Sequence, residues 1–131
     1  MLYLKLKKDR YNDYESNIHD CATIEALILR LFLTDDVGCR MHPGFFQLVY
    51  DPEFRGGCSN ATFIEKEDGY IFLSDGIGDP DEEPDPDPVK LKMTCEQYVH
   101  LLETWRDQVC KKMPNEVIIR YENGQFTFET K

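Results

Sequence analysis

Cys39 and His42 have the i, i+3 spacing of a pair of zinc ligands, and Cys58 follows further along the chain. Thiolate and imidazole are groups that Zn²⁺ prefers, but a structural zinc site usually draws on two such pairs. One pair is present in a chain with five cysteines and three histidines. The sequence therefore predicts no metal centre, and we expect no cofactor.

Asp79, Asp81 and Glu83 stand at alternate positions, as the first ligands of a calcium-binding loop do. Such a loop needs glycine at its sixth position for a sharp turn, and Pro84 occupies that position. A dedicated calcium site is therefore not expected.

A cysteine nucleophile needs a base within hydrogen-bonding reach. Cys21 is two residues from His19, although sequence adjacency says little about reach in the fold. No G-x-S-x-G, H-E-x-x-H or phosphate-loop motif occurs. We therefore expect a protein that is not an enzyme. The alternative, an enzyme, would be favoured by a fold that places His42 beside Cys39 or Cys58 in a concave pocket.

The most unusual composition lies in residues 75–88, which hold four of the seven prolines and seven carboxylates. These carboxylates are Asp75, Asp79, Asp81, Glu82, Glu83, Asp85 and Asp87. Proline stiffens such a segment, and charge of a single sign attracts a basic partner. We expect these seven residues to bind a cationic partner as substitutes for phosphate, and a solvated connector is the simpler alternative.

The whole chain is acidic as well, with 25 acidic and 15 basic residues and a net charge of −10. Without the seven carboxylates of residues 75–88 the net charge would be −3. A chain of this charge is repelled by phosphate backbones, so we expect neither direct nucleic-acid binding nor binding to an anionic membrane. A length of 131 residues with 41% hydrophobic residues predicts one globular domain over 1–131.

Two helices are expected to position these groups. The first begins after Asp20 or Thr23 and ends at Gly38. Its predicted buried face consists of Ile24, Leu27, Ile28, Leu31 and Phe32. The second begins at a capping box of Thr94 and Gln97 and ends at Pro114. Its apolar stripe consists of Tyr98, Leu101, Leu102, Trp105 and Val109.

Strands are expected over residues 2–6, 45–50, 61–65, 70–74, 117–121 and 126–128. Asp68-Gly69 and Asn123-Gly124 are dipeptides that favour tight hairpin turns. The order of elements predicts an α+β fold, a mainly antiparallel sheet of about five or six strands with two amphipathic helices packed on it.

The cellular compartment is predicted from what the sequence does not show. Its first residues alternate apolar and polar, unlike a signal peptide, and the apolar run 26–33 is too short to cross a bilayer. Five cysteines without a C-x-x-C pair are typical of reduced thiols. We therefore expect a soluble cytoplasmic protein with no membrane partner.

The C-terminal third resembles the small immunity proteins of bacterial contact-dependent growth inhibition and related polymorphic toxin systems. The resemblance rests on the helix entry Cys95-Glu96-Gln97-Tyr98, Trp105, Pro114, the strand 117–119, and Asn123-Gly124 before Phe126. It covers about a quarter of the chain and assigns no functional residue. It implies a single-domain, non-catalytic cytosolic protein that neutralises one cognate toxin domain, often a nuclease.

The leading hypothesis is therefore an immunity protein that binds a cationic nuclease domain through residues 75–88. The alternative from another class is a non-catalytic adaptor or regulatory module with an acidic loop. The genetic neighbourhood distinguishes the two, because an immunity gene should lie directly downstream of a large toxin gene. The sequence predicts no particular oligomeric state.

Overall fold

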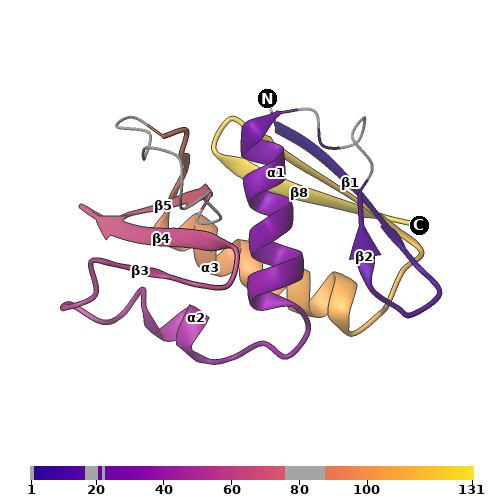
Figure 1. The fold of residues 1–131 in the computed structure, drawn as a ribbon, viewed down its shortest axis with the longest axis horizontal. Coiled ribbons are helices and arrows are strands. Elements are labelled where there is room, and N and C mark those ends of the chain that lie inside the picture. Colours follow the sequence, from indigo (N-terminus) through magenta and orange to yellow (C-terminus); the bar gives the residue numbers. More distant parts are fainter. Residues whose placement is uncertain (1, 17–20, 22, 76–87) are drawn as a thin grey trace, which may run out of the picture.

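The computed structural model describes residues 2–16, 21, 23–75 and 88–131, and within them eight strands form two four-stranded antiparallel sheets (Figure 1). The first sheet has the order β2-β1-β7-β8 and combines β1 (Leu2–Lys8), β2 (Tyr14–Glu15), β7 (Glu116–Glu122) and β8 (Gln125–Thr130). The second has the order β3-β4-β5-β6 and combines β3 (Gly56–Cys58), β4 (Thr62–Glu67), β5 (Tyr70–Asp75) and β6 (Leu91–Thr94). The predicted α+β class is confirmed, although the strands are divided between two sheets.

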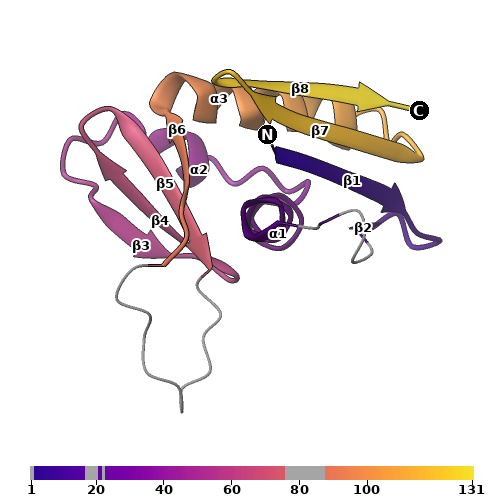
Figure 2. The ribbon, with the colours of Figure 1, turned by 90° about the horizontal axis from the view of Figure 1, so that it is seen from above.

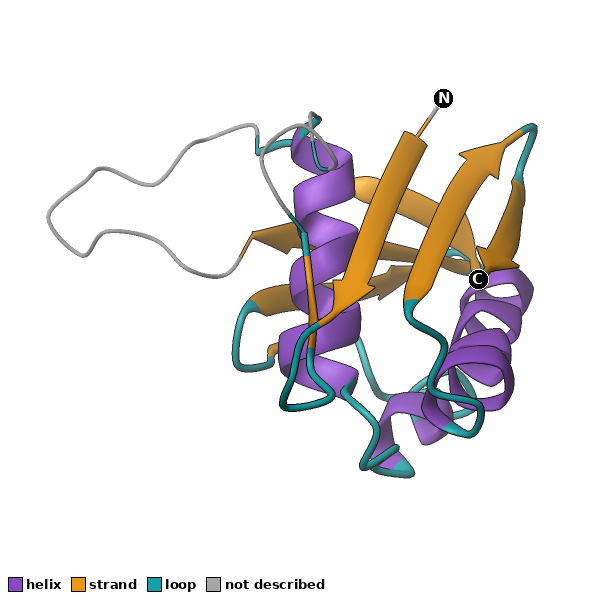
Figure 3. Ribbon diagram, turned by 90° about the vertical axis from the view of Figure 1, so that its right-hand side faces the viewer, coloured by secondary structure: helices purple, strands orange, loops and turns teal. Residues whose placement is uncertain are grey.

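Helix α1 (Ile24–Arg30) continues into the π-helical segment η1 (Leu31–Val37) and lies between the sheets, where it contacts β1 and β5 (Figure 2). In Figure 3 the strands of the first sheet lie in front of it. Thr23 is the N-cap, as predicted, and its hydroxyl accepts a hydrogen bond from the Ala26 N–H at 3.1 Å. Because α1 and η1 have a sheet on either side, more than one stripe is buried. The buried residues are Ala26, Ile28, Leu29, Phe32, Leu33 and Val37. Ile24, predicted to be buried, is 55% exposed.

The strand predicted over residues 45–50 is wrong, because the segment contains the short helix α2 (Gly44–Gln47). Pro43 occupies the N-cap with φ of −61°, and a proline ring favours that angle. Phe45 and Leu48 are three residues apart, as are Phe46 and Val49, and all four are half-buried. An apolar run without strict alternation fits either a short helix or a strand, so the sequence pattern was ambiguous here.

The hairpin predicted around Asp68-Gly69 is confirmed, since β4 and β5 pair and these two residues have φ of 52° and 83°. The flanking strands β3 and β6 were not predicted. Asp36, at the end of η1, joins the helical layer to the start of β4. Its carboxylate accepts hydrogen bonds from the Ala61 N–H at 2.6 Å and from the Thr62 N–H at 3.1 Å, and also from the Thr62 hydroxyl.

Helix α3 (Cys95–Thr104) and its π-helical continuation η2 (Trp105–Cys110) connect the second sheet to the first. The capping box is confirmed, because the Thr94 hydroxyl accepts from the Gln97 N–H at 3.0 Å while the Gln97 side chain accepts from the Thr94 N–H at 2.7 Å. All five predicted stripe residues are buried. Among them, Tyr98 donates its hydroxyl to the Phe45 carbonyl at 2.7 Å, and burial raises the pKa of this phenol.

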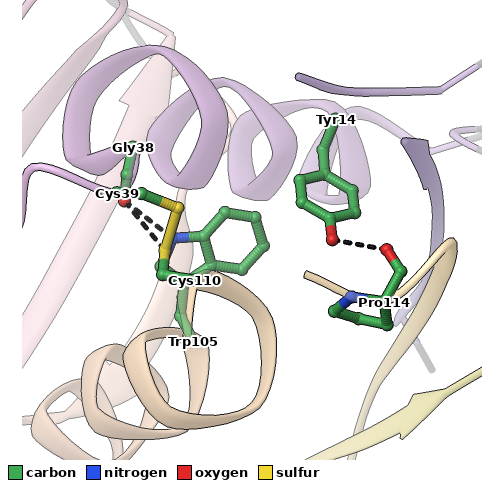
Figure 4. The surroundings of a disulfide bond; sticks show 6 residues. All are labelled: Tyr14, Gly38, Cys39, Trp105, Cys110 and Pro114. Carbon is green, nitrogen blue, oxygen red and sulfur yellow. Dashed lines mark hydrogen bonds between the residues drawn. A yellow bond between two sulfur atoms is a disulfide. The ribbon is translucent and has the colours of Figure 1, made fainter. Parts of the chain in front are cut away.

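A disulfide joins Cys39 to Cys110, with their Cα atoms 5.3 Å apart (Figure 4). The expectation that all five cysteines are reduced is therefore wrong for these two. The physical reason is that η1 and η2 end side by side although the two cysteines are 71 residues apart, a proximity that no local pattern reveals. Trp105 Nε1 strengthens the same junction by donating to the Gly38 carbonyl at 2.9 Å. Cys21, Cys58 and Cys95 are free thiols.

Candidate functional site

The acidic connection predicted to bind a partner joins β5 to β6. Asp75 is the last residue of β5, and the pairing of Leu73 with Leu91 holds the strand ends on either side of the connection together. Close by, Lys90 forms an ion pair with Glu65 at 2.8 Å. The structure does not describe the other residues predicted to bind a partner, which are Asp79, Asp81, Glu82, Glu83, Asp85 and Asp87. The residues considered above as a calcium-binding loop also lie outside the described ranges. The segment thus begins on the second sheet at Asp75, and its last residue, Pro88, comes three residues before β6.

His42 and Cys58, weighed as a base and a nucleophile, line one cavity of about 250 Å³ between α2 and β3. The other lining residues are Gly44, Phe45, Leu48, Phe54, Gly57, Ser59 and Ile64. His42 Nδ1 accepts a hydrogen bond from the Gly44 N–H at 3.0 Å, which leaves Nε2 for a second partner. The Cys58 thiol and the His42 imidazole therefore line the same largely apolar cavity, and no hydrogen bond joins them in the described chain.

Cys39 and Cys21, considered above as a metal ligand and as a nucleophile, do not line this cavity. Cys39 is bonded to Cys110, so its sulfur is not a free ligand beside His42. Burial raises the pKa of the Cys21 thiol, which disfavours the nucleophilic thiolate, and His19 lies outside the described residues. Within the described ranges no group of three or more metal-ligating side chains gathers.

A second concave surface, which sequence reasoning missed, lies between α3 and the start of β8. This groove has a volume of about 600 Å³. Its lining consists of Thr94, Glu96, Gln97, His100, Gly124, Gln125 and Phe126. The Gln97 side chain donates a hydrogen bond to the Gly124 carbonyl and so fixes the helix to the β7–β8 turn. The groove is polar on its helical side and is bounded on the other side by β8, the last strand of the first sheet.

The charge on the helical side of this groove is negative. Glu96, His100 and Glu103 are exposed and follow one another at i, i+4 and i+7, which places them on one face of α3. This spacing was present in the sequence, but its significance depended on what lies beside the helix. Beyond Glu103, Asp107 forms ion pairs through its Oδ1, which lies 2.9 Å from Arg106 Nε and 3.2 Å from Lys111 Nζ.

Comparisons with protein-family models, with curated proteins and with solved structures found no match. No helix in the described parts of the chain is both long and apolar enough to cross a membrane.

Proposed function

We propose that this chain is an immunity protein that binds and neutralises a cationic toxin domain, a nuclease, in the cytoplasm of the producing bacterium. One observation carries the proposal: seven of the 25 carboxylates are confined to a single connection, whose two ends are held together by the β5–β6 pairing. A segment of this kind concentrates negative charge in the connection between two neighbouring strands. The resemblance of the C-terminal third to immunity proteins gives independent support.

The physical basis is charge complementarity. A nuclease must attract phosphate, so its active groove carries Arg and Lys, and carboxylates can pair with the same groups. Close charge pairs at one nuclease–inhibitor interface, which is not this protein, are coupled by about 1.5–7 kcal/mol. A few such pairs are sufficient to hold the segment in the groove and exclude the nucleic acid.

A cytoplasmic location, which is part of this proposal, bears on the disulfide. Disulfides are rare in that compartment, where thiols are kept reduced. The proposal therefore requires the fold to persist with Cys39 and Cys110 as thiols. The Cys110 sulfur lies 3.6 Å from the Gly38 carbonyl, so a thiol at this position has an acceptor within reach.

The test is co-purification with the protein encoded by the neighbouring gene, followed by charge reversal. A triple variant of Asp79, Asp81 and Glu83 to Lys should weaken binding at least about tenfold, because each lost close pair is worth that much or more. The matched control reverses Glu15, Glu53 and Glu67, three exposed carboxylates on other parts of the surface. Equal affinity of the triple variant and its control would remove the segment from the interface. A partner that is unrelated to a toxin would favour the adaptor alternative.

The cavity shared by His42 and Cys58 supports a second candidate, thiol-dependent catalysis. A catalytic Cys58 would be alkylated by iodoacetamide much faster than a free thiol of ordinary pKa, and His42→Ala would abolish that excess. Alkylation at the rate of an unactivated thiol in both proteins would rule this candidate out.

A further inference from the structure

We propose, as a deepening of the function proposed above, that β8 is a docking edge for an extended cationic segment of the partner. The segment would add a fifth strand to the first sheet, beside β8. Its Lys or Arg side chains would then lie over Glu96 and Glu103 of α3. The inference concerns a surface different from residues 75–88, and it assumes the basic partner that the proposed function names.

The hydrogen-bonding pattern of the hairpin shows which backbone groups of β8 are not paired with β7. Glu116 and Lys131 exchange both of their backbone hydrogen bonds, at 3.2 and 3.0 Å. Because hydrogen-bonded pairs alternate along an antiparallel ladder, Gln125, Thr127 and Glu129 also direct their N–H and C=O groups toward β7. The backbone groups of Phe126, Phe128 and Thr130 then face away from β7. Within the described chain these three residues have no other hydrogen-bond partner.

The strand lacks the features that usually block an open edge. Protective edges carry proline, lysine, a bulge or an inward-pointing charge. The six residues of β8 include neither proline nor lysine, and the ladder with β7 runs without interruption from Val117–Thr130 to Glu122–Gln125. Its single charged residue, Glu129, is paired with Arg120 of β7 at 3.2 Å. The edge is therefore long enough and regular enough to accept another strand.

The charge beside the edge decides what kind of strand fits. The groove between β8 and α3 has Glu96 and His100 on its wall, and Glu103 stands on the same helical face. An added strand would lie about 5 Å from β8 and would present every second side chain to that face. Positive side chains at those positions would be favoured. A second copy of this chain is disfavoured, because it would bring a further net charge of −10 to the same place.

The experiment uses the full-length protein and a synthetic probe, an acetylated and amidated seven-residue peptide in which Lys and Val alternate. The same peptide with Glu in place of Lys is the control. The Lys peptide should slow hydrogen exchange at the amides of Phe126, Phe128 and Thr130, and the Glu peptide should not. Protection that appears elsewhere, or with both peptides alike, would overturn the proposal.

Two pairs of variants separate backbone pairing from charge. Thr130→Pro removes an outward N–H, whereas Thr130→Val keeps it, so only the first should weaken the Lys peptide, by about fivefold. E96Q/E103Q should weaken it by a similar factor at low salt, while E15Q/E53Q, which removes the same charge elsewhere, should not. Equal affinities within either pair would contradict the proposal. If the toxin binds but does not slow hydrogen exchange of the β8 amides, this inference is wrong and the proposed function stands. If β8 binds the Lys peptide but no toxin binds the protein, the proposed function is wrong and this inference stands.

Discussion

Asp107 illustrates how a single surface carboxylate is tuned by its neighbours. Its Oδ1 lies 2.9 Å from Arg106 Nε and 3.2 Å from Lys111 Nζ. Hydrogen bonds from Arg106 and then from Lys111 are the largest causes that lower the pKa of Asp107, to about 2. Lys111 lies one helical turn beyond Asp107, a spacing at which oppositely charged side chains meet.

This shift gives a pH dependence with a defined sign. A carboxyl whose pKa is lower in the folded chain than in the unfolded chain contributes stability above the unfolded pKa and loses it as the pH falls through the folded pKa. The unfolded value is 3.8 and the folded value is about 2. Wild type should therefore melt at a higher temperature than Asp107→Asn above pH 4, and the two melting temperatures should converge as the pH falls to about 2.

Thermal unfolding of both proteins between pH 2 and 6 measures this convergence. Asp35→Asn controls for the loss of one exposed carboxylate that forms no ion pair in the described chain. A constant gap between wild type and Asp107→Asn over the whole range would contradict the assignment.

Side-chain interactions could be predicted from the sequence only where the partners are a few residues apart. The Thr94–Gln97 capping box was predicted because its two members are fixed by local spacing. The hydrogen bonds that Thr62 donates to the Asp36 carboxylate link residues 26 apart, and nothing in either local sequence indicates the other partner. The groove between α3 and β8 could not be predicted for the same reason, because it forms between two elements that are far apart in the sequence.

At the scale of elements, the junction between η1 and η2 is the point at which two helical segments share a covalent bond. The Cys39–Cys110 disulfide closes a loop that contains all four strands of the second sheet. Constraining a long loop limits the freedom of the unfolded chain, and native disulfides typically contribute about 2–4 kcal/mol. The bond also holds the segment that leads to α2 against η2, and the hydrogen bond from Trp105 to the Gly38 carbonyl acts at the same place.

Removal of this bond should lower stability without changing the fold. Cys110→Ser is expected to reduce the free energy of unfolding by about 2–4 kcal/mol, measured by urea denaturation under oxidising conditions. Cys58→Ser, at an exposed free thiol, is the matched control and should have little effect. Dithiothreitol should lower wild type to the level of the variant, and equal stability of all three proteins would show that the bond does not form in solution.

Elements with strong local signals were predicted, and those defined by their neighbours were not. The two hairpins have turn dipeptides with positive φ, and the second helix has a cap and a stripe. By contrast, β3 contains two glycines and is a strand only because it pairs with the edge of β4. The two-residue strand β2 likewise forms only by pairing with β1. The run of residues 45–50 had no period that could separate helix from strand.

At the scale of the whole molecule, the negative charge is unevenly distributed along the sequence. The buried hydrophobic cluster draws on both sheets, α1 and α3, whereas six of the seven carboxylates of the acidic connection fall in residues 76–87. Charge of one sign that is concentrated in one segment acts on an approaching partner over about 10 Å at 0.1 M salt. The segment should therefore govern how fast a basic partner arrives, and an edge strand such as β8 should govern how long it stays.

Replacement of residues 76–87 by a Gly-Ser linker of equal length tests this division. Because Ile77 is the only hydrophobic residue in the segment, the melting temperature should stay within about 4 °C, the shift that about 1 kcal/mol produces in a domain of this size. Association with the cognate toxin, followed by stopped flow, should slow at low salt and lose most of its salt dependence. A variant with the same twelve residues in scrambled order keeps the charge and should associate like wild type. Unchanged association of the neutral variant, or slow association of the scrambled one, would mean that long-range charge on this segment does not steer the partner.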